Sequence, residues 1–138
     1  MRRARDPLGV TVPSGQVRRR NARVLLAVIR LANGTLGLVA PELLIGRIER
    51  GSPPGASAIY AFRLFGVRTI FLGAELLVRR DAELQRALRQ GVVIHASDVA
   101  TSTLLGVRHR TSQRTSAMLA AISTVNVLLA VAALEPRR

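Results

Sequence analysis

The sequence predicts an all-α, integral membrane four-helix bundle whose helices are antiparallel and alternate up, down, up and down. Although 21 of its 138 residues are basic and 8 are acidic, 49% are hydrophobic. Four apolar segments rich in Leu and Ala follow one another, each close to the roughly 20 residues that cross a bilayer as a helix. Short connections separate them, which places consecutive helices side by side in opposite directions.

We expect the membrane domain to span residues 24–134, with helices at about 24–45, 57–78, 91–107 and 116–134. A β-rich fold is excluded because the segments show no alternation of period two and Leu and Ala dominate them. Pro41 predicts a kink near the outer end of the first helix, and the fourth segment carries no charge. The first three segments carry the ionisable side chains Arg30, Glu42, Arg63, Arg68, Glu75, His95 and Asp98.

The remaining segments are linkers and ends. Residues 1–23 are rich in Arg and interrupted by Pro and Gly, so we expect a flexible cytoplasmic tail there, and residues 135–138 form a short C-terminal tail. The linker 46–56 has the composition of a turn. Residues 79–90 contain good helix formers with Asp near the start, which predicts that they extend the third helix beyond the membrane.

The net charge of +13 is unevenly distributed. Within the apolar segments three Arg are balanced by three acidic residues, so the whole excess lies in linkers and ends. This separation, and the scarcity of aromatic residues for base stacking, argue against nucleic acid as a partner. All the basic residues are Arg, and the absence of Cys excludes disulfides, thiolate metal sites and Cys nucleophiles.

The Arg distribution also predicts orientation. The N-terminal tail, the second linker and the C-terminus hold 13 Arg, against 5 in the other two linkers. Arg-rich short loops stay on the cytoplasmic side, so we expect a multi-pass protein of the cell (inner) membrane with both termini cytoplasmic. The Arg residues just before the first helix are expected to contact anionic lipid headgroups, or alternatively an acidic protein partner: Arg18, Arg19, Arg20 and Arg23.

Charged side chains inside a membrane are costly unless they are paired and turned inward. Arg68 and Asp98 lie near the middle of their segments and differ in depth by three residues, about 4.5 Å. By the same counting, Arg30, Glu75 and His95 share the cytoplasmic half, while Glu42 and Arg63 share the outer half. Two interpretations remain open: a hydrogen-bonded network that fixes helix register, or a proton or ligand site built from Arg68, Asp98, His95 and Glu75.

Small residues predict where helices approach closely. Gly66 and Gly73 are seven residues apart on one face of the second segment, roughly opposite Arg68 and Glu75. They form a groove for a neighbouring helix, and Gly34 and Gly37 are expected to do the same in the first segment.

The strip from Ala61 to Gly73 reads R-x-x-G-x-R-x-x-x-x-G, and His95-x-x-Asp98 is followed by small residues up to Gly106. These motifs resemble those of uncharacterised small four-helix membrane proteins of high-GC bacteria, near the DoxX-like families. The resemblance covers about residues 24–134 and implies a fold more than an activity. The basic tail is a departure from it.

No nucleophile–base pair, phosphate-binding loop or redox cysteine is evident in the sequence. We therefore expect no catalytic activity, no metal and no cofactor, and a role as an accessory or scaffold subunit of a membrane assembly. The alternative is a small transporter or membrane oxidoreductase partner that uses the His/Asp/Arg/Glu cluster for protons or a ligand. The expected partners are the anionic lipid bilayer and a membrane protein or a second copy of the chain.

Overall fold

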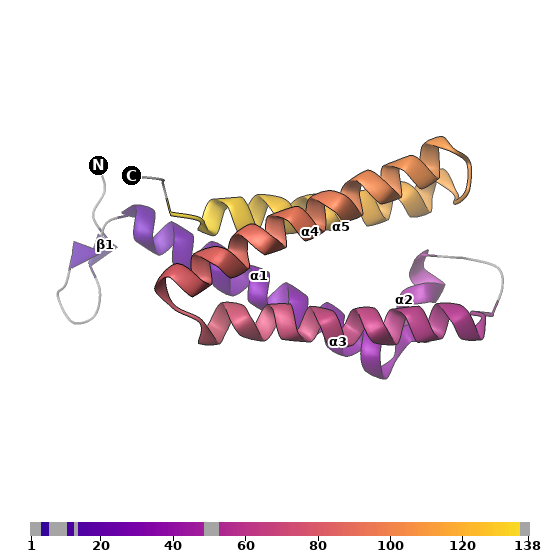
Figure 1. The fold of residues 1–138 in the computed structure, drawn as a ribbon, viewed down its shortest axis with the longest axis horizontal. Helices are drawn as coiled ribbons and strands as arrows, with labels where there is room; N and C mark the ends of the chain where they lie inside the picture. The colour runs from indigo at the N-terminus through magenta and orange to yellow at the C-terminus, as the bar shows by residue number, and fades with distance from the viewer. Residues whose placement is uncertain (1–3, 6–10, 13, 49–52, 136–138) are drawn as a thin grey trace.

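The computed structural model describes residues 4–5, 11–12, 14–48 and 53–135, and over these residues the chain is helical apart from one short strand pairing (Figure 1). The prediction of an all-α protein is confirmed for this part. Strand β1 (Ala4–Arg5) pairs antiparallel with β2 (Thr11–Val12). The helices are α1 (Ser14–Val39), α2 (Pro41–Ile48), α3 (Ala56–Val78), α4 (Asp81–Val107) and α5 (Gln113–Ala133).

Helix α1 begins ten residues before the first predicted helix, so residues 14–23 do not belong to a flexible tail. The physical reason is local, because Arg is nearly as good a helix former as Leu and this stretch is rich in Arg. Apart from β1 and β2, the rest of the predicted tail lies outside the described residues, as do residues 136–138 of the C-terminal tail.

The predicted segment 24–45 is two helices and not one kinked helix. Helix α1 ends at Val39, Ala40 is non-helical, and α2 starts at Pro41. Proline suits the first position of a helix, where its missing N–H has no intrahelical partner to lose. The Ala40 carbonyl then accepts a 3.1 Å hydrogen bond from the backbone N–H of Leu43.

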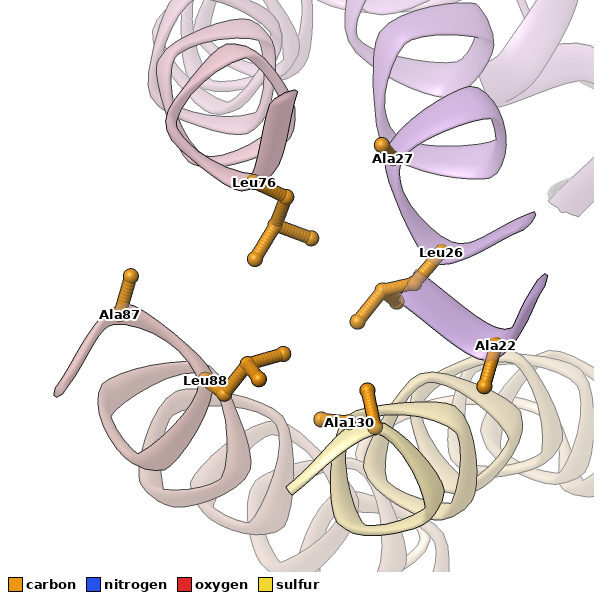
Figure 2. Close-up of a cluster of buried hydrophobic side chains, with 8 residues drawn as sticks. Ala22, Leu26, Ala27, Leu76, Ala87, Leu88 and Ala130 are labelled. Carbon is orange, nitrogen blue, oxygen red and sulfur yellow. The ribbon is translucent and has the colours of Figure 1, made fainter. Parts of the chain in front are cut away.

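The long helices pack as two pairs, α1 with α3 and α4 with α5 (Figure 1). Buried apolar side chains from all four helices meet at one end of the molecule (Figure 2): Ala22, Leu26, Ala27, Leu76, Ala87, Leu88, Ala130 and Ala133. Toward the other end the two pairs diverge, and α2 stands between them. The core is therefore confined to the end where the two pairs converge.

Helix α2 is tied to the start of α5. Thr115 is buried at the start of α5, and its hydroxyl donates a 2.8 Å hydrogen bond to the Ile48 carbonyl at the end of α2. The Ser112 hydroxyl caps α5 by accepting a 3.0 Å hydrogen bond from the Thr115 N–H, which explains why α5 begins at Gln113, before the predicted residue 116. These bonds bring α2 and α5 together at the diverging end.

Glycines set the distance between α1 and α3. A Cβ atom added to Gly66 would lie 2.5 Å from the Leu38 nitrogen and 2.6 Å from the Gly34 oxygen. One added to Gly37 would lie 3.1 Å from the Phe62 oxygen, and one added to Gly73 would lie 3.2 Å from the Ala27 oxygen. The structure thus places all four predicted packing glycines, Gly34, Gly37, Gly66 and Gly73, where the two backbones touch.

Much of the apolar surface faces outward. Among the described residues, 21 large hydrophobic side chains are exposed, and they are distributed over all five helices. Of the nine buried hydrophobic residues five are Ala, and eight belong to the cluster at the core end. Two of the described helices, α1 and α5, are long and apolar enough to cross a membrane.

The backbone contact at Gly66 yields the first prediction. Gly66→Ala should lower the free energy of unfolding by about 1–3 kcal/mol, because the added methyl group meets backbone atoms that cannot move independently. Thermal unfolding of the purified protein, followed by circular dichroism, measures the effect. Gly46→Ala in α2 is the matched control: it has open space around it, and it should keep or raise the melting temperature. Equal losses in both variants would contradict the prediction.

Candidate functional site

Asp98 is the centre of a polar cluster that joins the two helix pairs. Its Oδ2 atom lies 4.0 Å from Arg68 Nη2 on α3 and 3.3 Å from His95 Nδ1, one turn earlier on α4. The sequence places Arg68 and Asp98 at matching depths, and the structure brings them together. Because α3 and α4 otherwise touch little, this cluster is a principal polar link between them.

His95 is buried, with 6% of its surface exposed. Its Nδ1 atom faces the Asp98 carboxylate, while its Nε2 atom is buried with no hydrogen-bond partner among the described residues. Leaving a buried nitrogen unpaired costs free energy, and a water molecule bonded to Nε2 would offset this cost.

Arg30 is the most deeply buried charged residue in the described part of the chain, at 1% exposure. Its Nη1 atom donates a 3.3 Å hydrogen bond to the Leu72 carbonyl of α3. Its Nε and Nη2 atoms are buried and have no partner among the described residues. The guanidinium group therefore extends from α1 past α3 and forms only one hydrogen bond there.

Gly91 on α4 makes room for this guanidinium group. A Cβ atom at Gly91 would lie only 2.5 Å from Arg30 Nη2. The sequence analysis gives Gly91 only as the first residue of a predicted helix and does not predict this contact. The available signal was its spacing, since Gly91 lies four residues before His95 and so shares its helix face.

Glu75 does not join the buried cluster as expected. Its Oε1 atom pairs with Arg79 Nη2 at 3.0 Å, and Arg79 Nη1 also pairs with Glu83 Oε2 at 2.9 Å. Arg79 is four residues from both carboxylates, and groups at this spacing meet more readily than groups on separate helices. The hydrogen bonds to Glu75 and Glu83 raise the pKa of the Arg79 guanidinium above its usual value.

Glu42 and Arg63, which the sequence predicts to share the outer half and balance each other, do not form an ion pair in the described part of the chain. Both residues are exposed. The break at Ala40 places Glu42 in the first turn of a separate helix, α2. There its carboxylate is stabilised by the positive end of the helix dipole and does not need a cationic side chain.

The Arg residues expected to meet lipid headgroups lie on the first turns of α1. Arg18 and Arg20 are exposed, whereas Arg19 and Arg23 are half-buried. The Arg23 Nε atom is buried and unpaired within the described part of the chain. A helical backbone thus presents these charges in place of an irregular tail.

A cleft of about 390 Å³ lies between the diverging helix pairs. All five helices line it, and among the described residues of its lining Asp98 alone is ionisable. Most of the wall is apolar, with Phe62 and Phe65 in an edge-to-face arrangement at a centroid distance of 6.4 Å. Its volume is within the range of small-molecule sites, so the polar cluster opens onto a space that can hold a ligand.

No protein-family model, curated protein or solved structure matches this chain.

The buried guanidinium yields the second prediction. Arg30→Met should keep or raise the melting temperature, because an apolar side chain of similar length replaces a buried cation that has one hydrogen bond. Arg30→Ala should lose about 2–5 kcal/mol, since it leaves a cavity. Thermal unfolding followed by circular dichroism compares the two variants. A loss for Arg30→Met as large as that for Arg30→Ala would contradict the prediction and indicate that the charge itself is stabilising.

Proposed function

We propose that the chain is a small multi-pass protein of the cell (inner) membrane, in which α1, α3, α4 and α5 cross the bilayer as an antiparallel four-helix bundle. The observation that carries the proposal is the inverted distribution of polarity. Large apolar side chains lie on the outside, while Arg30, His95 and Asn126 are buried. A protein in water gains free energy from the reverse arrangement, and an apolar exterior is stable in lipid.

The charges of α3 and α4 are compatible with membrane crossing in this arrangement. Arg63 lies within two turns of the N-terminal end of α3, from which a long side chain can reach the lipid–water interface. Arg68 is paired with Asp98, and Glu75 is near the opposite end, paired with Arg79. The excess of Arg in the N-terminal tail and the α3–α4 connection favours cytoplasmic termini.

As a role, we propose an accessory or scaffold subunit of a membrane assembly. Arg68 lies in the middle of α3, yet 52% of its side chain is exposed, and 36% of the Asp98 side chain is exposed. A charge facing lipid at this depth costs about 2.5–3.5 kcal/mol on insertion scales. A polar surface of a membrane partner or of a second copy of the chain would remove this cost.

A second candidate is a small transporter or oxidoreductase partner that handles protons or a ligand. It is favoured by the position of Asp98, which lines the cleft and also contacts His95. Intramembrane ionisable groups commonly mark such sites. The resemblance to small four-helix membrane proteins near the DoxX-like families is likewise a proposal. It concerns the four-helix membrane fold and does not favour either role.

The membrane placement yields the third prediction. The native chain should stay in the membrane pellet after alkaline carbonate extraction and dissolve only in detergent. Because it has no Cys, single cysteines report sidedness cleanly. In intact cells a membrane-impermeant maleimide should label Arg110→Cys, between α4 and α5, but should label Arg80→Cys, between α3 and α4, only after permeabilisation. Release by carbonate would refute membrane insertion, and the opposite labelling pattern would refute the orientation.

The exposed Arg68 yields the fourth prediction. Cross-linking in native membranes, followed by mass spectrometry, should capture a partner or a second copy through the face around Arg68. Arg68→Gln should weaken this capture about tenfold or more, because a desolvated charged contact is lost. Arg63→Gln is the matched control on the same helix and should have little effect. Equal capture by all three proteins would contradict the subunit role.

A further inference from the structure

We propose that the cleft between the helix pairs binds a neutral, lipid-soluble alcohol, with its hydroxyl group at Asp98 and its hydrocarbon part against Phe62 and Phe65. This inference depends on the membrane placement proposed above, since the bilayer is where such a molecule is concentrated.

Helix α2 bounds the cleft on one side. Helix α2 contributes Leu44 and Ile48 to its wall, and the bond from Thr115 to the Ile48 carbonyl holds α2 against α5. Its volume of about 390 Å³ is enough for roughly a dozen groups of the size of a water molecule. This matches a molecule with a medium hydrocarbon chain or a small ring system.

The charge around the cleft favours a neutral ligand. Asp98 alone would attract a cation, but the Arg68 guanidinium beside it cancels its charge. An amine would meet Arg68 as a like charge, and a fatty acid would meet the Asp98 carboxylate as a like charge. A neutral head group avoids both repulsions, and it also enters an apolar space without the cost of desolvating an ion.

The hydrogen-bonding groups favour a hydroxyl among neutral head groups. Arg68 and His95 both contact Asp98 through Oδ2. Within the described residues, Oδ1 has neither of these contacts and can accept a hydrogen bond from a ligand O–H. Asn33 on α1 lines the same cleft, and its amide can donate to the hydroxyl oxygen. A hydrocarbon would leave these groups unused.

The test uses the full-length protein in phosphatidylcholine nanodiscs and a 1-decanol derivative with a diazirine in its chain. After photolysis, mass spectrometry should locate the label on the cleft walls, around Phe62 and Leu105. Unlabelled 1-decanol should suppress this labelling at concentrations about tenfold lower than decane, decylamine or decanoate require. Labelling that is spread evenly over exterior residues such as Phe71, or that all four competitors suppress equally, would overturn the proposal.

Two variants on neighbouring positions separate cleft binding from lipid contact. Ser123→Phe fills the cleft and should reduce the competed labelling about tenfold, whereas Thr124→Phe adds the same ring on the exposed side of α5 and should leave it unchanged. Circular dichroism of both variants checks that the helices are intact. If both label like the native protein, the cleft is not the site. Carbonate extraction of native membranes tests membrane insertion independently of the labelling. If the chain stays in the pellet but shows no competed labelling, the ligand proposal fails while the membrane placement is retained.

Discussion

The contact between the backbones of α1 and α3 at Gly34 and Gly66 is the constraint on which the rest of the structure depends. Any side chain at Gly66 would push the two helices apart. Their close approach brings the Leu72 carbonyl within hydrogen-bond distance of Arg30. The Arg30 guanidinium then extends to α4, where Gly91 leaves room for it. One packing contact thus sets the position of the second helix pair relative to the first.

The polar cluster follows from the same geometry. His95 lies one turn beyond Gly91 on α4, and Asp98 lies almost one turn beyond His95, so both face the region between the pairs. Arg68 on α3 then lies at the distance needed to reach Asp98. Buried polar groups cost free energy unless they are paired. The contact between Arg68 and Asp98 joins α3 and α4, which belong to different helix pairs and otherwise touch little.

The sequence predicts how far along its helix each polar residue lies. It predicts only in part which neighbour the side chain of that residue contacts. Counting residues is enough to match Arg68 with Asp98, and spacing is enough to place Gly66 and Gly73 on one face. The same counting fails for Glu75, because Arg79, which caps the end of α3, is a nearer partner. It fails for Glu42, because Pro41 starts a new helix instead of kinking the old one. The helix at residues 14–23 is not evident from an Arg-rich stretch interrupted by Pro and Gly, although Arg itself favours helices.

The uneven placement of the core has a consequence for motion. Apolar packing among all four long helices is confined to the end around Leu26, Leu76 and Leu88. At the far end, α2 contacts α5 through Thr115 and a few neighbours. Local opening costs least where few buried contacts must break. Amide protons of α2 and of the first turns of α5 should therefore exchange with solvent deuterium before those near the core, and the width of the cleft should fluctuate while the opposite end stays rigid.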